Sequence, residues 1–321
     1  MSESAPIVRI AGLRLDRGGR TVLRDIDLAV PRGQVVAVLG PSGSGKSTLL
    51  AALTGELEPA AGTVEVLGRP VPRNMRALLE LRKGIGVLLQ GNGLLTDLTA
   101  AENVALPLRT HTRLPKPVID RLVRMKLHAR ALLELRKGIG VLLQGNGLLT
   151  DLTAAENVAL PLRTHTRLPK PVIDRLVRMK LHAVGLRAAA DAFPRELSGG
   201  MARRVALARA LALDPPLMIY DEPLTGLDPI ASGVVMELVR RLNDSLGLTS
   251  IVVTHHVHET LPVADHAIVI ANGGIVFSGT PDALQASTDP LVRQFLDGQP
   301  DGPIPFDAAP RGATPSPMEA A

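Results

Sequence analysis

The apolar positions of this chain fall into short runs. Three runs of apolar and β-branched residues, Gln34–Leu39, Leu217–Tyr220 and Ile251–Val253, have the length and composition of buried strands. Helical patterns occur in the segments LLAALTGEL, which starts at Leu49, and ARRVALARALAL, which starts at Ala202. No uninterrupted apolar run approaches the roughly 20 residues that a membrane-spanning helix needs. The pattern therefore predicts a soluble protein with a buried core.

An identical tandem repeat interrupts this pattern. Residues 76–129 (the first copy) and 130–183 (the second copy) agree at all 54 positions. Solenoid repeats drift in sequence and need about three copies to share a core. Two identical copies therefore indicate a recent duplication of a gene segment, or an error in assembling the sequence.

Only one copy of the apolar run GIGVLLQ can occupy one place in a sheet. We expect the first copy to supply this strand, because it follows the first strand and helix directly. The second copy is then expected to supply the helix that enters Val184–Gly200. No helix breaker stands at the junction, where Pro117–Ala129 runs into RALLELRK, so a long joined helix is predicted there.

Composition narrows the class of protein. The chain has 321 residues and no cysteine, which excludes a disulfide scaffold and any Cys-ligated zinc or iron–sulfur site. Its net charge of +5 equals the excess of nine basic over four acidic residues in one copy of the repeat. The positive charge is thus a by-product of the repeat, and we expect no nucleic-acid partner. The N-terminal segment MSESAPIVRIAG lacks the features of a signal peptide.

A glycine-rich segment joins the first predicted strand to its helix. The sequence GPSGSGKST fits the P-loop pattern G-x-x-x-x-G-K-[ST] between a strand and a helix. Glycines let backbone N–H groups curl around phosphate oxygens, and the helix N-terminus adds partial positive charge. Lys46 is expected to reach the β- and γ-phosphates, and Ser47 to bind Mg²⁺. The predicted ATP-binding residues are Gly40, Pro41, Ser42, Gly43, Ser44, Gly45, Lys46, Ser47 and Thr48.

An acidic pair follows the second predicted strand. Asp221 stands where a Walker B aspartate holds Mg²⁺, and Glu222 beside it is placed to polarise an attacking water. Three histidines, His255, His256 and His258, follow the third strand. Zinc sites need three or four converging ligands, so we expect a role for His255 alone.

Further motifs carry a family resemblance. LSGGM at residues 197–201 precedes a helix, and LTGLD at 224–228 and IVVTH at 251–255 resemble the D-loop and H-loop. With them the chain resembles the nucleotide-binding subunit of an ABC transporter from about Ile7 to Phe306. The segment LTDLTAAENVALPLRTHTRLP, Met201 after LSGG, and the tail RQFLDGQPDGPIPF are similar to the Mce-associated ATPases of phospholipid transporters in the Gram-negative inner membrane.

The resemblance implies a fold and a domain plan. The expected fold is α/β, a RecA-like P-loop NTPase with an antiparallel β subdomain and a helical subdomain. The nucleotide-binding domain would span residues 7–298, with the helical subdomain at about 91–213. Residues 299–321 would form a partly disordered tail. The block Asp289–Phe306 would wrap the other ATPase subunit, or pack loosely as a terminus.

The resemblance also implies roles for single residues. Glu222 would be the general base and His255 a switch on the γ-phosphate. Asp221 and the Q-loop glutamine, Gln90 or its duplicate Gln144, would complete the Mg²⁺ shell with Ser47. The signature residues Ser198, Gly199 and Gly200 would contact the nucleotide bound to the partner subunit. Asp228, in the D-loop, would bridge the two nucleotide sites.

One position departs from the family pattern. Where the family has a tyrosine–glycine pair that stacks on adenine, this chain has Arg17 and Gly18. A guanidinium can lie flat on a base, so Arg17 is a candidate for the same contact. The alternative is a turn arginine that points into water.

The implied function is ATP hydrolysis that powers phospholipid movement through a membrane permease. The implied partners are a second copy in an ATP sandwich, the permease, a small regulatory subunit and a periplasmic lipid-binding protein. The implied location is the cytoplasmic face of the inner membrane. The alternatives are the ATPase of another importer or exporter, and a cassette inactivated by the repeat. An ABC ATPase acting on DNA or ribosomes fits less well, because the chain lacks a second cassette and heptads.

Overall fold

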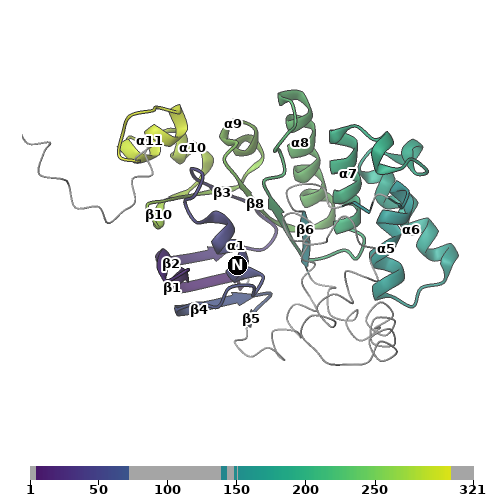
Figure 1. The fold of residues 1–321 in the computed structure, drawn as a ribbon, viewed down its shortest axis with the longest axis horizontal. Helices are drawn as coiled ribbons and strands as arrows, with labels where there is room; N and C mark the ends of the chain where they lie inside the picture. The colour runs from purple at the N-terminus through teal and green to yellow at the C-terminus, as the bar shows by residue number, and fades with distance from the viewer. Residues whose placement is uncertain (1–4, 72–138, 143–147, 150, 305–321) are drawn as a thin grey trace, which may run out of the picture.

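Two sheets organise the chain (Figure 1). The computed structural model describes residues 5–71, 139–142, 148–149 and 151–304. A six-stranded sheet has the order β10-β9-β3-β8-β7-β6, and a four-stranded antiparallel sheet has the order β2-β1-β4-β5. The strands are β1 (Val8–Arg17), β2 (Arg20–Val30), β3 (Val35–Leu39), β4 (Ala61–Val66), β5 (Arg69–Pro70), β6 (Ile139–Leu142), β7 (Leu217–Asp221), β8 (Thr249–Thr254), β9 (His266–Ala271) and β10 (Gly274–Gly279).

Helices flank the larger sheet, and α5, α6 and α7 gather beyond its β6 end (Figure 1). Among the described residues, no helix has the length and apolar character to span a membrane. The helices and 3₁₀ turns are α1 (Lys46–Leu53), α5 (Ala154–His165), α6 (Lys170–Ala183), η2 (Arg187–Ala189), η3 (Pro194–Glu196), α7 (Gly199–Ala210), α8 (Pro229–Leu246), α9 (Val257–Thr260), η4 (Leu261–Val263), α10 (Pro281–Gln285) and α11 (Pro290–Asp297).

The central strands β3, β7 and β8 of the six-stranded sheet are buried on both faces, which explains their continuous apolar sequences. Along β7, Leu217 and Ile219 pack with α1 and the antiparallel sheet, whereas Met218 and Tyr220 pack with α5 to α8. The pairs β3–β8, β8–β7 and β7–β6 are all parallel. The predicted strands and the predicted α/β P-loop fold with an antiparallel β subdomain are confirmed.

The second copy of the repeat supplies the strand at the end of this sheet. Ile139–Leu142 forms β6 and pairs with Leu217–Tyr220 of β7. The expectation that the first copy provides this strand was therefore wrong. The expectation that the second copy supplies the helix entering Val184–Gly200 is confirmed, because α6 ends at Ala183.

The segments on either side of the repeat explain why the second copy, and not the first, forms β6. Behind the second copy, Val184 and Leu186 are buried, and the Leu186 N–H donates to Leu181 O at 2.8 Å. Ahead of the first copy, the chain leaves β5, whose Arg69 and Pro70 are exposed. When the second copy forms β6, the buried connection from α6 to Val184 and Leu186 is kept. The additional 54 residues then follow the exposed strand β5 in the chain.

Several predictions fall on residues that the structure does not describe. They are the joined helix at the repeat junction, the glutamines Gln90 and Gln144, and the disorder of the tail beyond Ile304. Before that point, the buried side chain of Gln294 bonds both the N–H and the carbonyl of Ile304. The domain boundaries at 7–298 and about 91–213 stay predictions.

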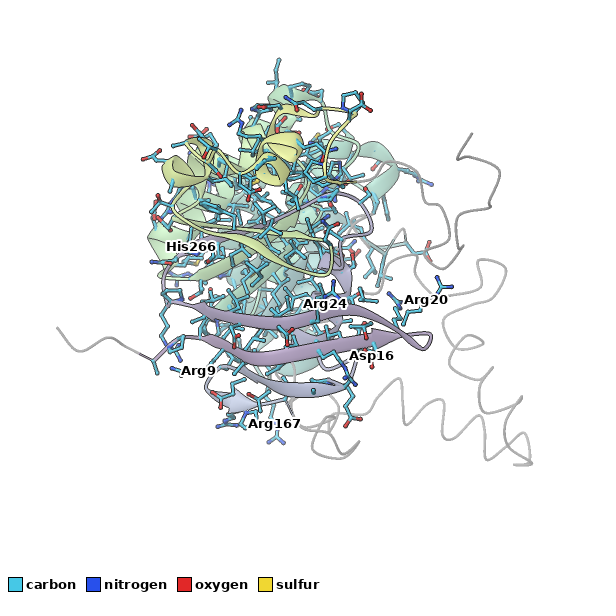
Figure 2. All side chains as sticks on the ribbon, turned by 90° about the vertical axis from the view of Figure 1, so that its left-hand side faces the viewer. Arg9, Asp16, Arg20, Arg24, Arg167 and His266 are labelled. Carbon is cyan, nitrogen blue, oxygen red and sulfur yellow. The ribbon has the colours of Figure 1, made fainter. Side chains whose placement is uncertain are left out.

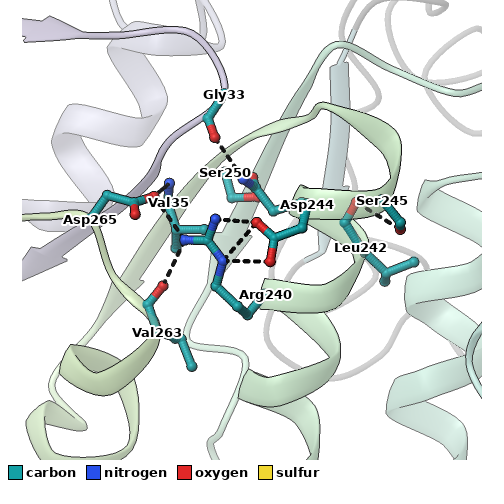
Figure 3. Close-up of polar contacts among 10 residues, drawn as sticks. Gly33, Val35, Arg240, Leu242, Asp244, Ser245, Ser250, Val263 and Asp265 are labelled. Carbon is teal, nitrogen blue, oxygen red and sulfur yellow. Dashed lines mark hydrogen bonds and ion pairs between the residues drawn. The ribbon is translucent and has the colours of Figure 1, made fainter.

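A polar network ties α8 to the entry of β3 (Figure 3). The Val35 N–H and the Arg240 guanidinium each donate to Asp265 Oδ2 at 2.8 Å. Arg240 also binds the exposed Asp244 one turn along its own helix. Nearby, Asn243 Nδ2 donates to Gly33 O at 2.8 Å. The network therefore fixes the start of the strand that carries the glycine-rich loop.

We expect Asp265→Ala to lower the free energy of unfolding by about 1–2 kcal/mol, because it leaves the Val35 N–H without its acceptor. Asp244→Ala is the matched control, since it removes an exposed i,i+4 ion pair of the same arginine and should change stability very little. Urea unfolding of the two variants measures the difference. Equal losses would show that the bond to Val35 is unimportant.

Candidate functional site

The glycine-rich loop lies between β3 and α1. Gly40 has a φ of 151° and Gly45 a φ of 104°. A Cβ at Gly40 would lie 2.2 Å from Ile270 O, and one at Gly45 would lie 2.7 Å from a methyl carbon of Leu23. Both positions therefore require glycine. Lys46 folds back over the loop and donates from Nζ to Gly40 O at 2.8 Å and to Pro41 O at 3.0 Å.

The acidic pair faces this lysine. Burial lowers the pKa of Lys46, and the nearby Glu222 and Asp221 act in the opposite direction. Burial raises the pKa of Asp221 to about 6, with a further increase from Glu222 and a decrease from Lys46. Asp221 Oδ1 and Ser44 Oγ are buried and lack hydrogen-bond partners among the described residues. Oxygen atoms left without partners beside a P-loop suit a hard cation such as Mg²⁺.

Glu222 is held in one orientation. It lies just past β7 at a φ of 47°, which is uncommon for a residue other than glycine. Its N–H donates to Val253 O at 2.8 Å. Its carboxylate accepts a bond from the Thr254 hydroxyl at 3.1 Å and lies 3.0 Å from Nδ1 of His255. The ends of β7 and β8 thus bring the predicted catalytic pair together.

The signature turn begins α7. Ser198 caps this helix, and its Oγ accepts a bond from the Met201 N–H at 3.2 Å. A Cβ built at Gly199 would meet no atom within 4 Å, so this helix N-terminus is open. Asp228 caps α8 in the same way, accepting from the Ala231 N–H at 2.9 Å. The α7 end, capped by a neutral hydroxyl, keeps the positive partial charge that an anion site requires, whereas the Asp228 carboxylate already offsets this charge at the α8 end.

Arg17 lies at the end of β1, beside a tight hairpin. Gly18 and Gly19 have φ values of 57° and 74°, and Arg17 pairs with Arg20. Figure 2 shows the hairpin end with Asp16 and Arg20 labelled, and the Thr21 hydroxyl donates to Asp16 at 2.8 Å. Arg17 itself is exposed. Its side chain is therefore accessible from solvent at the end of the hairpin.

The other predicted site residues divide into two groups. The P-loop, Asp221, Glu222 and His255 come together at the carboxyl ends of β3, β7 and β8. The hydrogen bonds of Ser198 lie within α7, and a Cβ built at Gly200 would meet only Ala231, at 3.9 Å. Among the described residues, no hydrogen bond joins the signature turn to the P-loop.

These features coincide with a known domain. Residues 23–225 match the family model described as ABC transporter. The chain belongs to the ABC transporter family. It is 41% identical over 302 residues to the intermembrane phospholipid transport system ATP-binding protein MlaF of Escherichia coli strain K12. That alignment covers 94% of this chain and 93% of MlaF.

Solved structures agree with the fold. CbiO1 from Clostridium perfringens, part of the ABC transporter complex cbiONQ, superposes with a TM-score of 0.67 at 23% identity, covering 92% of this chain and 96% of its own. The ATP-binding cassette MJ0796, a dimer in a post-hydrolysis state with ADP and Pi, gives a TM-score of 0.59 at 26% identity. That match covers 85% of this chain and 98% of MJ0796.

Two contacts in this ABC cassette were missed by the sequence analysis. Thr254 orients the carboxylate of Glu222, and Arg203 of α7 donates from Nη2 to Thr225 O at 2.7 Å. The contact of Thr254 could have been predicted, because this threonine lies at a strand end beside His255. The reach of Arg203 from the signature helix to the D-loop depends on the packing of α7 and α8, which local sequence does not reveal.

Asp221 should give this cassette a distinctive pH dependence. An unfolded Asp has a pKa of 3.8, so between about pH 4 and 6 the folded chain binds the extra proton. Stability therefore falls as pH rises through this range, and the cost is complete above pH 6. We expect Asp221→Asn to stabilise the nucleotide-free protein at pH 7.5 by on the order of 2 kcal/mol and to lose this advantage near pH 4.

Urea unfolding at several pH values tests this expectation. The exposed Asp191 supplies the matched control, and Asp191→Asn should follow the parent protein at every pH. If Asp221→Asn were no more stable than the parent at pH 7.5, burial of the Asp221 charge would not be costly.

Proposed function

We propose that this chain is the ATP-hydrolysing subunit of a transporter that moves phospholipid through a membrane permease. The observation that carries the proposal is the 41% identity, over nearly the whole of both chains, to MlaF. The exposed signature turn supports a working unit of two copies, with ATP between the P-loop of one and Ser198–Gly200 of the other. The permease would place this unit at the cytoplasmic face of the inner membrane.

In this proposal the P-loop binds ATP within one chain. Gly40–Thr48 would surround the phosphates, and Lys46 would exchange its bonds to Gly40 O and Pro41 O for phosphate oxygens. Asp228 would stand between the two sites of the dimer. Arg17 would lie against the base, or point into water.

Mg²⁺ would be held by Ser47, Asp221 and a glutamine of the repeat, and it would neutralise charge that develops on the phosphates. We propose Gln144 rather than Gln90 for this place. The second copy supplies β6, and Gln144 follows its last residue, Leu142, by two positions.

Glu222 would take a proton from a water molecule as the water oxygen attacks the γ-phosphorus and ADP leaves. The Thr254 hydroxyl and the His255 ring hold the carboxylate on two sides, so its orientation is set before ATP binds. His255, half exposed, would contact the γ-phosphate. Positioning of this kind is the main contribution of a protein to phosphoryl transfer.

Reconstitution tests the proposal. The full chain is purified together with its membrane permease and placed in vesicles that contain a fluorescent phospholipid. We expect ATP turnover and transfer of the labelled phospholipid, both lost without Mg²⁺. ATP turnover that responds to another solute would indicate a different ABC transporter. ATP binding without turnover would indicate a cassette inactivated by the repeat, although the complete sheet supports an intact one.

A further inference from the structure

A buried asparagine of α5 forms hydrogen bonds with the turn that connects the β6 segment to α5. Asn157 of α5 is 0% exposed. Its Nδ2 donates to Leu149 O at 3.1 Å, to Leu152 O at 3.0 Å and to Thr153 O at 3.0 Å. Its Oδ1 accepts from the Leu149 N–H at 2.9 Å. One side chain thus holds both ends of the turn that follows the β6 segment.

The same end of α5 is closed by a capping box. The Thr153 N–H donates to Glu156 Oε2 at 2.9 Å, and the Glu156 N–H donates to the Thr153 hydroxyl at 3.2 Å. The turn and the first helical residues therefore move as one unit, because each end of the turn is bonded to the helix.

The opposite side of this helix end bonds the chain that leads to the signature. The Ala154 N–H donates to Ala192 O and the Ala155 N–H to Ala190 O, each at 2.8 Å. The next residues form η3, where the Phe193 N–H donates to Glu196 Oε2 at 2.7 Å. Ser198 follows two residues later and caps α7. Hydrogen bonds thus run from the turn at Leu149, through α5, to the segment 190–192, and the chain continues from there through η3 into the signature turn.

The last turn of α7, the helix that begins at the signature, also contacts Asn157. Arg209, in the last turn of α7, approaches Asn157 Oδ1 with Nη1 at 3.5 Å. Burial lowers the pKa of Arg209 to about 10. Asn157 therefore contacts both the turn after the sheet and the helix that begins at the signature.

We propose that Asn157 is a positioning residue for ATP hydrolysis, which sets Ser198–Gly200 at the correct place for the partner's nucleotide. This rests on the proposed ATP sandwich between two copies. An amide meets the bonding pattern, since its two N–H groups lie within hydrogen-bond distance of three carbonyls, one N–H being shared, while its oxygen accepts an N–H. A carboxylate would face those carbonyls without donors. An apolar residue would remove the bond to Leu152 O, whereas Leu149 O and Thr153 O would keep the backbone N–H bonds of Leu152 and residue 157.

The repeat provides a matched control for the test. Asn103 occupies the same position in the first copy, within an identical sequence, and lies outside the described residues. We compare Asn157→Asp with Asn103→Asp in the full chain, measuring ATP turnover without permease, the Kd of ATP, and the ATP concentration that half-saturates dimer formation in a Glu222→Gln background. The Kd measures ATP binding to the P-loop. Turnover and dimer formation also depend on contact between the signature turn and the partner's nucleotide.

We expect Asn157→Asp to lower kcat by about tenfold or more and to raise the half-saturating ATP concentration for dimer formation, while the Kd of ATP changes less than about twofold. Asn103→Asp should match the parent in all three. A second variant, Glu196→Ala, breaks the exposed η3 link without touching α5 and should show the same pattern.

Two outcomes would overturn the proposal. In the first, Asn157→Asp loses ATP binding and folded structure together while Glu196→Ala retains parental turnover, which would leave Asn157 a structural residue only. In the second, the two asparagine variants behave alike. Failure of phospholipid coupling alone would count against the proposed transport function, because these measurements need neither permease nor lipid.

Discussion

Glu222→Gln should lower ATP turnover of the full chain by about 10²- to 10⁴-fold, the usual contribution of a general base. The change replaces an acceptor of protons with an amide of nearly the same shape. The Thr254 hydroxyl can still donate to the remaining carbonyl oxygen, so the loop past β7 should keep its conformation. Binding of ATP depends on the P-loop and should persist. A coupled assay of turnover, together with a measurement of the Kd of ATP, tests whether hydrolysis is lost while binding is kept.

Glu237→Gln is the control for this experiment. Glu237 lies on α8 with its side chain about two thirds exposed, so its change should leave turnover at the parental rate. If Glu222→Gln retained most of the turnover, the proton would have to leave the attacking water by another route, and the proposed role of Glu222 would be wrong.

Val158→Asp should unfold or strongly destabilise the chain, whereas the same change at Val104 should have little effect. Val158 is 0% exposed in the cluster formed by α5 to α8. A carboxylate there has no partner to offset its lost hydration, so we expect a loss of at least about 3 kcal/mol. Native domains have only about 5–15 kcal/mol in total, so the loss is large.

Val104 occupies the same position in the first copy, and it lies outside the described residues. The two substitutions create the same chemical change in the same local sequence, so their difference reports only which copy fills the core. Thermal unfolding of both variants measures it. Greater damage from Val104→Asp would show that the first copy, and not the second, packs against α7 and α8.

Local chemistry made much of the site predictable. The glycines and Lys46 of the P-loop act within nine consecutive residues, and Asp221 and Glu222 follow directly on a strand. Their roles depend on the carboxyl ends of parallel strands meeting at one edge, which is a general property of this fold class. The sequence therefore predicted the P-loop and the acidic pair, the family resemblance added His255, and the structure places these residues together.

The choice between the two copies was not predictable from the copies themselves. Their residues are identical, so propensity, pattern and burial preference are equal, and only the flanking chain distinguishes them. The packing of Val184 and Leu186 behind the second copy became visible only with the fold. The role of Asn157 was hidden for a similar reason, because its partners lie on a turn and a second helix that sequence alone does not bring together.

The place of β6 in the sheet has an evolutionary consequence. Selection on folding acts on Ile139–Leu142 and on the helices behind it, because these residues complete the sheet and the core. We expect this constraint to be weaker in residues 76–129, because β6 comes from the second copy. In descendants that keep both copies, synonymous changes should accumulate equally in the two segments, while amino-acid replacements should gather in the first. The pair is thus set to diverge from a state of perfect identity, with the second copy keeping the ancestral residues.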